Sequence, residues 1–337
     1  MLAEHEKHRS RDLFDAVGRT PIIRLEKLSS ALGQSMYGKC EFLNPGGSVK
    51  DRAAKSIIED ALAGGRLKPG GTIVEGTAGN TGISLAMLGN ARACRTVIFI
   101  PDDQAREKID VLRAYGADVH VVPRVAYEDE QNYYHQARRF AESIPGAIWA
   151  DQFNNTANRR AHFEGTGPEI WTALGEQLTA FVAAAGTGGT IAGVAAALKR
   201  QKPALRVILA DPMGSALYCY VKRGTLEFEG DSIAEGIGIK RVTENLKDAP
   251  IDDAVRVTDR TMVEMAHWLA RNEGLLLGGS SALNVSAAAR VARELPPRST
   301  VVTILCDGGQ RSMSHLYNAA WLAQNGLTPR ADDLSFL

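Results

Sequence analysis

The chain has 337 residues, enough at about 150 residues per domain for two domains or one large α/β unit. Lysine plus arginine and aspartate plus glutamate each number 39, so the formal net charge is zero. This balance argues against binding to nucleic acid or to anionic membranes, since both need a basic excess. Charged residues at 23% and hydrophobic residues at 45% are typical of a globular protein and exclude wholesale disorder.

The cysteines and the N-terminal segment indicate whether the protein binds a metal and in which compartment it is expected. None of the four cysteines is spaced as a CxxC pair, and no His, Cys and carboxylate cluster has metal-ligand spacing. We therefore predict no metal site and a reducing, cytoplasmic location. Residues 1–12 are charged and lack the apolar core of a secretory signal. The uncharged stretch 178–198 is long enough to cross a bilayer, but its glycines favour a buried strand, a turn and a buried helix.

Short apolar runs alternate with helical patterns along the chain. Residues 51–63 place apolar side chains at i, i+3, i+4, i+7 and i+8, which predicts a helix with one buried face. Apolar runs predict strands at 72–75, 96–100, 119–122, 181–184, 207–210 and 301–305. Strands that alternate with helices indicate parallel sheets covered on both faces, so we expect an α/β fold. Two lobes are expected to meet near Asn44 and near Asp151.

A glycine turn followed by a lysine opens the first of these helices. Residues 44–52 read NPGGSVKDR, so Lys50 lies in the first helical turn. The helix dipole disfavours a cation there, and desolvation would lower the lysine pKa further. A neutral amine in a glycine-shaped pocket is suited to condensation with an aldehyde. The alternative is a solvated lysine on a capped helix, and these residues alone do not decide between the two.

Two further glycine loops run from a strand into a helix. Residues 75–84 read EGTAGNTGIS and offer converging amides and polar side chains to a phosphate or a carboxylate. The alternative for this loop is a turn needed only for packing. Residues 185–190 read AGTGGT, which lacks the Walker and dinucleotide signatures but suits a monoester phosphate. A third loop, 278–281, precedes a helix expected from Ala282, and a serine there would cap that helix or hydrogen-bond a ring nitrogen.

One loop for a cofactor phosphate, one for a substrate carboxylate and an amine suited to an aldehyde form a specific combination. Together they imply pyridoxal 5′-phosphate and an amino-acid substrate.

These motifs resemble the fold-type II pyridoxal-phosphate enzymes, and among them the cysteine synthase and cystathionine β-synthase family. The resemblance extends from Val17-Gly18-Arg19-Thr20-Pro21 to Gly309-Gln310-Arg311. It includes, in the family's order, NPGGSVKDR, GTAGNTGIS, Gln152-Phe153, TGPEIW at 166–171, GTGGT and AEGIG at 234–238.

The resemblance implies two domains, each a mostly parallel twisted sheet flanked by helices, similar to tryptophan synthase β. Residues 45–155 would form a smaller, mobile domain that binds the substrate carboxylate. Residues 10–44 together with 156–330 would form a larger domain that binds the cofactor phosphate, with 1–9 and 331–337 as tails. The family is usually homodimeric, so the same assembly is expected here.

The resemblance also implies roles for individual residues. Lys50 would bind the cofactor aldehyde covalently and act as the catalytic base. Asn80 would bind the ring oxygen and Ser280 the ring nitrogen, and the phosphate would be held by Gly186, Thr187, Gly188, Gly189 and Thr190. The amino-acid substrate would lie against Thr77, Ala78, Gly79, Asn80, Thr81, Gln152 and Gly236.

Some positions depart from the family's common pattern. Ala78 replaces a serine and removes one hydroxyl from the carboxylate site, and Asn158 is followed by Arg159 instead of proline. Lys240 and Arg241 follow the AEGIG loop, where they would recognise an acidic substrate group or form a solvated surface pair. These features are closer to a branch that includes cysteine desulfhydrases.

Cys306 and His162 are predicted to have structural roles, and two alternatives remain for Asp307. Cys306 ends a predicted buried strand and is expected to be a small core residue, not a nucleophile. His162 lies in a predicted helix and is expected to make a structural hydrogen bond. The turn at Asp307 either shapes the rim of the pocket or has no further role.

The sequence therefore predicts a pyridoxal-phosphate enzyme that acts on a serine-type amino acid and on sulfide or another thiol. The first hypothesis is a cysteine synthase that converts O-acetyl-L-serine and sulfide to L-cysteine and acetate. The alternatives are an L-cysteine desulfhydrase, which makes sulfide, pyruvate and ammonia, a cystathionine β-synthase-type condensation, and a non-catalytic anion- or nucleotide-binding module. Exclusion of water from the site separates the synthase from the desulfhydrase.

Overall fold

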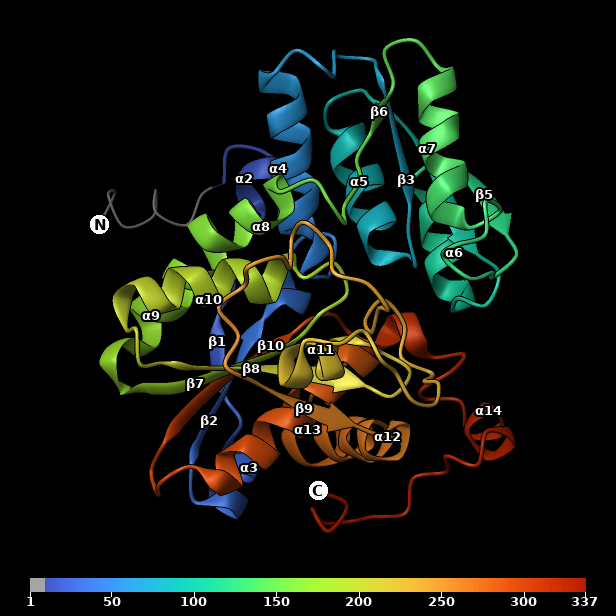
Figure 1. Cartoon of the computed structure of the whole chain (residues 1–337). Coiled ribbons are helices and arrows are strands. Elements are labelled where there is room, and N and C mark those ends of the chain that lie inside the picture. Colours follow the sequence, from blue (N-terminus) through green and yellow to red (C-terminus); the bar gives the residue numbers. More distant parts are fainter. Residues whose placement is uncertain (1–9) are drawn as a thin grey trace.

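The computed structural model describes residues 10–337, and the predicted tail 1–9 lies outside the described residues. The chain forms two sheets, each flanked by helices (Figure 1). The larger sheet has the order β1-β2-β10-β7-β8-β9, with β1 (Ile22–Arg24), β2 (Ser35–Cys40), β7 (Leu178–Ala184), β8 (Arg206–Pro212), β9 (Asp253–Val257) and β10 (Thr300–Leu305). The smaller sheet has the order β5-β4-β3-β6, with β3 (Thr72–Gly76), β4 (Arg95–Pro101), β5 (Asp118–Val122) and β6 (Ile148–Trp149).

Neighbouring strands are parallel except for the pair β1 and β2, in which Ile22 lies opposite Lys39. The predicted α/β fold with mostly parallel sheets is therefore confirmed. Every predicted strand is present and extends slightly beyond its predicted bounds. The sequence pattern does not predict β1, β2, β6 and β9, because these strands are short or carry polar residues such as Lys39 and Arg256.

Helices cover both faces of the larger sheet. One face carries α3 (Glu26–Leu32), α12 (Asp259–Trp268) and α13 (Gly279–Glu294), and the other carries α9 (Gly167–Leu174), α10 (Gly189–Gln201) and α11 (Leu217–Arg223). The smaller sheet is flanked by α4 (Lys50–Ala63), α5 (Asn80–Asn90), α6 (Arg106–Ala114) and α7 (Tyr133–Ser143). The shorter helical segments are α2 (Leu13–Ala16), α8 (Ala157–Ala161), α14 (Ala319–Gln324), η1 (Glu41–Leu43), η2 (His162–Thr166), η3 (Gly175–Gln177), η4 (Leu269–Glu273) and η5 (Gly309–Ser312).

The core lies between the sheets and their helices. All residues of β10 are buried, as expected for a parallel strand covered on both faces. Helix α4 buries the face that its periodicity predicts, which includes Ile57 and Ile58. The stretch 178–198 forms β7, a glycine turn and most of α10, as predicted. Within residues 10–337, no helix combines the length and the apolar character needed to cross a membrane.

One predicted boundary is wrong. Helix α13 begins at Gly279, so the expectation of a helix from Ala282 places its start three residues too late. Ser280 consequently lies in the first turn of the helix instead of in a preceding loop. The turn before the helix is tight, since a Cβ atom at Gly278 would lie 2.1 Å from the Asp307 Oδ1 atom.

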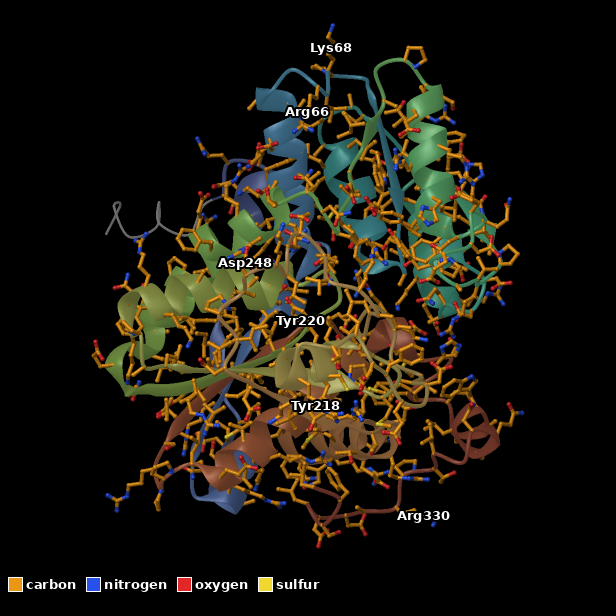
Figure 2. All side chains as sticks on the ribbon, in the orientation of Figure 1. Arg66, Lys68, Tyr218, Tyr220, Asp248 and Arg330 are labelled. Atoms are coloured by element: carbon orange, nitrogen blue, oxygen red, sulfur yellow. The ribbon has the colours of Figure 1, made fainter. Side chains whose placement is uncertain are left out.

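Both sheets contribute residues to one space at the boundary between them. Helix α4 begins there with Lys50 and leads to Arg66 and Lys68 at the far end of the smaller sheet and its helices, here named the smaller unit (Figure 2). Residues that directly follow β3, β7 and β10 line a single cavity in the same place. Open α/β sheets bind ligands beyond the carboxyl ends of their strands, so the topology itself indicates a site here.

Candidate active site

The cavity has a volume of about 700 Å³. It brings together almost all of the predicted site residues, which come from opposite sides of the boundary between the sheets. Its walls include Lys50, Thr77, Ala78, Gly79, Asn80, Thr81, Gln152, Gly186, Thr187, Gly188, Thr190, Gly236 and Ser280. Gly189 is the predicted residue that does not line it, because this glycine packs against Asn158 instead.

Lys50 is the first residue of α4, and its half-buried side chain lines the cavity. Burial lowers the pKa of its ammonium group from the ordinary value, and this effect outweighs the opposite influence of Cys306 and Asp307. The backbone of the preceding turn is fixed because Val49 N–H donates to the Cys306 carbonyl at 2.8 Å. This placement does not fit a solvated surface lysine.

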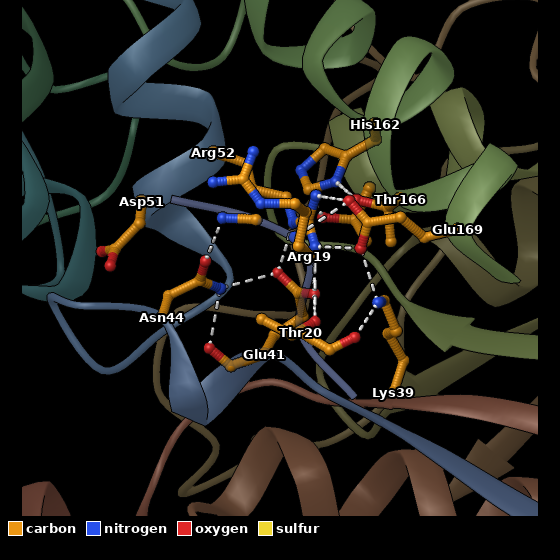
Figure 3. Close-up of polar contacts among 12 residues, drawn as sticks. Arg19, Thr20, Lys39, Glu41, Asn44, Asp51, Arg52, His162, Thr166 and Glu169 are labelled. Carbon is orange, nitrogen blue, oxygen red and sulfur yellow. Dashed lines mark hydrogen bonds and ion pairs between the residues drawn. The ribbon is translucent and has the colours of Figure 1, made fainter. Parts of the chain in front are cut away.

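A buried ion network holds the first turn of α4 to the larger sheet and its helices, here named the larger unit (Figure 3). The Arg52 guanidinium donates to Glu41 Oε2 at 2.7 Å and to Glu169 Oε1 at 2.7 Å. Lys39 Nζ donates to the second Glu169 oxygen at 2.6 Å, and Thr20 donates to Glu41 at 2.7 Å. Although burial acts in the opposite direction, these two cations lower the pKa of Glu169 to about 2. The network thereby fixes the helix turn that carries Lys50.

The neighbouring Asp51 stabilises the glycine turn before α4 through hydrogen bonds. Its carboxylate accepts from Gly46 N–H at 2.5 Å and from the hydroxyl of Ser84 on α5. Burial raises the pKa of Asp51 to about 6. Sequence analysis assigned no role to Asp51 or Arg52. The signal for one was present, since both are charged residues inside a helix whose apolar pattern indicates a buried face.

The predicted carboxylate loop is a network of hydroxyl and amide groups. Thr81 Oγ1 donates to Gln152 Oε1 at 2.5 Å, and Gln152 Nε2 donates to Glu75 Oε1 at 3.2 Å. Burial raises the pKa of Glu75 well above its ordinary value, which favours a neutral group beneath the loop. Gly79 has φ 129°, and a Cβ there would lie 2.5 Å from Lys108 Cδ, so only glycine fits. The interpretation that this loop serves packing alone does not explain its polar lining of the cavity.

The predicted phosphate loop joins β7 to α10 through Gly188, which has φ 82°. A Cβ at Gly186 would lie 2.1 Å from the Gly236 carbonyl oxygen, so glycine is required for the close packing of these two loops. Two hydroxyl groups lie beside the amides at the N-terminus of α10. Thr187 Oγ1 accepts from Asn158 at 2.9 Å, and Thr190 Oγ1 lies 3.2 Å from His162 Nε2. Amides, hydroxyls and a helix dipole form a donor set that fits a phosphate monoester.

His162 has the role predicted for it, whereas Cys306 follows β10 on the cavity wall and is only partly buried, so its prediction as a core residue is wrong. His162 begins η2, and its Nδ1 atom lies 2.9 Å from Thr166 Oγ1, so the predicted structural hydrogen bond is present. Burial lowers the pKa of this histidine well below its ordinary value. Cys306 lines the cavity beside Lys50, but burial raises the pKa of its thiol to about 12, so it is not an activated nucleophile.

Polar residues also occupy the region around Ser280. The neighbouring Ser281 uses its hydroxyl inside the protein, where it accepts from Cys306 N–H at 2.8 Å, whereas Ser280 lines the cavity. Asp307 Oδ2 accepts from Asn80 Nδ2 at 2.7 Å. Asp307 does not itself line this cavity, but its carboxylate holds Asn80, which does.

Sequence analysis missed a cluster that closes one side of the cavity. Glu235, in the predicted substrate loop, accepts from Lys108 on α6 and lies 2.8 Å from His315 Nδ1. The hydrogen bond to Glu235 raises the pKa of His315, whose ring stacks on Trp321. No local motif marks these residues, because they lie 127 and 80 positions from Glu235 in the sequence. Only the tertiary fold brings them together.

Neither Lys240 nor Arg241 lines the cavity. Arg241 stacks on aromatic rings and Lys240 lies over Phe228, so the structure does not support recognition of an acidic substrate group by this pair. Ala78 does line the cavity, and its methyl group stands where the family usually has a hydroxyl.

Residues 13–307 match the family described as pyridoxal-phosphate dependent enzyme. The chain belongs to this family. It is 50% identical over 320 residues to cysteine synthase 1 of Emericella nidulans, an alignment that covers 94% of this chain and 86% of that protein. It is 44% identical over 338 residues to a cysteine synthase of Dictyostelium discoideum, covering 97% of this chain and 89% of that one.

Solved structures give the same result for the fold. An O-acetylserine-dependent cystathionine β-synthase from Helicobacter pylori superposes with a TM-score of 0.83 at 36% identity, covering 90% of this chain and 97% of that one. O-ureido-L-serine synthase superposes with a TM-score of 0.84 at 36% identity, covering 93% and 99%. The predicted family, its cofactor class and its fold are confirmed.

Proposed function

We propose that this chain is a cysteine synthase that replaces the acetate of O-acetyl-L-serine with sulfide. One observation carries the proposal: a single cavity joins a lysine of lowered pKa, a glycine and threonine loop suited to phosphate, and a hydroxyl and amide loop suited to a carboxylate. The relatives named cysteine synthase, at 44–50% identity over nearly the whole chain, support the same activity.

The residues present fit pyridoxal phosphate. Thr187, Thr190 and the amides that open α10 would hold its phosphate, and Asn80 and Ser280 would hold the ring oxygen and the ring nitrogen. Lys50 would bind its aldehyde, since a lysine of lowered pKa is neutral and nucleophilic at lower pH than an exposed one. When bound, the cofactor supplies the electron sink that makes Cα of an amino acid acidic.

The remaining steps belong to this chain's side chains. Thr81, Gln152 and the amides of the 77–81 loop bind the substrate carboxylate and orient Cα towards Lys50. Binding of the substrate amine frees the Lys50 amine, which then removes the Cα proton as a general base. The bond from Cβ to the acetate oxygen breaks, sulfide forms a bond to Cβ, and Lys50 Nζ returns the proton to Cα. Closure of the cavity by Glu235 and its neighbours excludes water, which would otherwise divert the substrate to pyruvate and ammonia.

The organisation of the chain is part of the proposal. Residues 45–155 would act as the smaller, mobile domain, and residues 10–44 with 156–330 as the larger domain. We also propose a homodimer in a reducing compartment, the cytoplasm, which agrees with the four free cysteines. Light scattering of the purified holoenzyme tests the dimer, and a monomer would contradict it.

Three incubations of the holoenzyme test the activity, with cysteine, pyruvate and cystathionine measured in each. O-acetyl-L-serine with sulfide should give L-cysteine and acetate. L-cysteine alone should give little pyruvate, and O-acetyl-L-serine with homocysteine should give little cystathionine. A dominant second or third product would replace the proposal with the desulfhydrase or the cystathionine synthase.

Replacement of Lys50 tests the site. Lys50→Ala should lower kcat at least about a thousandfold, because both the covalent attachment and the general base are lost. Borohydride reduction should link the cofactor to Lys50 in the wild type and to no residue in the variant. Linkage elsewhere would show that the lysine is misassigned.

A further inference from the structure

An irregular segment crosses the cavity between the two sheets. Residues 231–246, here named the strap, lie between α11 and β9 and contain no helix or strand. Its first part, from Asp231 to Ile239, lines the cavity, and its Gly236 carbonyl packs against Gly186 of the phosphate loop. The strap belongs in sequence to the larger unit, so any contact with the smaller unit couples the two.

Arg241 makes such a contact. Its guanidinium carbon lies 3.7 Å from the ring centroid of Tyr127, 4.7 Å from that of Phe153 and 5.1 Å from that of Tyr134. Tyr127 follows β5, Tyr134 is part of α7 and Phe153 follows β6, so all three rings lie within residues 45–155, the smaller unit. These three rings are here named the aromatic box.

The chemistry of this contact is unusual for a surface arginine. The Arg241 Nη2 atom is buried without a hydrogen-bond partner among residues 10–337. The cation is therefore held by the faces of aromatic rings, and a desolvated contact of this kind is stronger than an exposed one. A residue that only served solubility would keep its guanidinium hydrated.

The aromatic box is connected to the residues expected to bind the substrate carboxylate. Phe153 follows Gln152 directly and lines the cavity. On the other side, Asn245 at the end of the strap donates to the carbonyl oxygens of Gln152 at 3.0 Å and Phe153 at 2.8 Å. Arg241 and Asn245 thus both contact the segment that carries Gln152. The Gln152 side chain in turn accepts from Thr81 at 2.5 Å.

We propose that Arg241 is a positioning residue that, through the aromatic box, sets the distance between the carboxylate site and the phosphate loop. Its loss weakens amino-acid binding and admits water to the cavity, because the aromatic contact between the strap and the smaller unit is lost, although the contacts of Glu235 and Asn245 remain. This inference rests on the proposed function. It assigns a role to a residue that touches neither the substrate nor the cofactor.

The adjacent residue provides a matched control. Lys240 also contacts a ring, with Nζ 3.8 Å from the centroid of Phe228, but both side chains are exposed. Phe228 precedes the strap in the same connection between α11 and β9 and does not belong to the smaller unit. Lys240→Met therefore removes a cation and a ring contact without uncoupling the two units.

The experiment compares Arg241→Met, Arg241→Lys, Tyr127→Ala, Tyr127→Phe and Lys240→Met with the wild-type holoenzyme. Arg241→Met and Tyr127→Ala should raise KM for O-acetyl-L-serine about tenfold, leave kcat within about threefold, and raise the ratio of pyruvate to cysteine. Arg241→Lys should be intermediate because it keeps a cation without the planar stack. Tyr127→Phe and Lys240→Met should behave as the wild type.

Two readouts separate this role from general stability and from the proposed function. Each variant is first checked for its thermal unfolding temperature and cofactor content, and Tyr127→Ala replaces Arg241→Met if the latter does not fold. The dissociation constant of L-serine, measured from the change in cofactor absorbance, is obtained for every variant, even if the wild type makes no cysteine. The inference is overturned if Arg241→Met or Tyr127→Ala matches Lys240→Met in amino-acid affinity and product ratio.

Discussion

A substitution in the buried ion network tests whether that network fixes the first turn of α4, which carries Lys50. Glu41 is fully buried, and it accepts from Arg52 Nε at 2.7 Å, from Thr20 at 2.7 Å and from Asn44 at 2.8 Å. Glu41→Gln keeps the shape but removes one of the two carboxylates that balance Arg52. Loss of one partner from a buried ion pair costs about 3 kcal/mol, since the remaining charge stays buried.

The expected fall in the melting temperature of Glu41→Gln follows from the length of the chain. At about 2.1 cal/mol/K per residue, the 337 residues unfold with an entropy of about 0.7 kcal/mol/K, so Tm should fall by about 4 °C. The value of kcat should fall as well, because Arg52 and Lys50 share the first turn of α4. Calorimetry of the holoenzyme and initial-rate measurements check the two effects.

A surface ion pair provides the control. Arg95 and Asp118 lie 2.7 Å apart, but their side chains are 59% and 41% exposed. Asp118→Asn should cost less than about 0.5 kcal/mol and shift Tm by less than about 1 °C. If Glu41→Gln melts at the same temperature as Asp118→Asn and keeps full activity, then the network does not hold the turn and the reasoning is wrong.

Three further predictions concern protonation and substrate affinity. The pKa of Glu169 is about 2 in the folded protein against an ordinary 4.5, so its stabilising contribution is complete above pH 4.5 and is lost as pH falls towards 2. Acid-unfolding curves of Glu169→Gln and the wild type should therefore lie apart at neutral pH and converge near pH 2; a constant separation would contradict this. Because burial lowers the pKa of Lys50 below 10.5, the rate at which cofactor-free protein reacts with added pyridoxal phosphate should rise with pH to a midpoint below 10.5. A midpoint at or above that value would show a solvated lysine. Ala78→Ser adds a hydroxyl to the carboxylate loop and should lower KM for the amino acid up to about tenfold, with Ala78→Gly as a control that adds no donor.

Local motifs were sufficient to find the main parts of the site. Lys50, the 77–81 loop and the 186–190 loop are each recognisable because glycines, hydroxyls and a helix start occur within a few residues of one another. The same local information predicted α4 and six strands, since periodicity and continuous apolar runs are properties of the segment itself.

Other parts of the site could not be found in this way. Glu235 and Lys108 look like ordinary charged residues in the sequence, and Arg241 was expected to recognise an acidic substrate group or to lie on the surface. Only long-range packing shows what these residues contact. The start of α13 was placed too late because its first turn consists of glycine and serine, which are poor helix formers, and tertiary contacts override that preference.

Sequence alone determined the α/β class, the family resemblance and the chemistry-bearing loops, because each depends on residues that are neighbours along the chain. The tertiary structure decided which distant charges neutralise Arg52, how the strap contacts the smaller unit and why burial raises the pKa of Glu75 and of Cys306. These properties depend on burial and on distances between residues far apart in sequence, and both quantities exist only once the chain has folded.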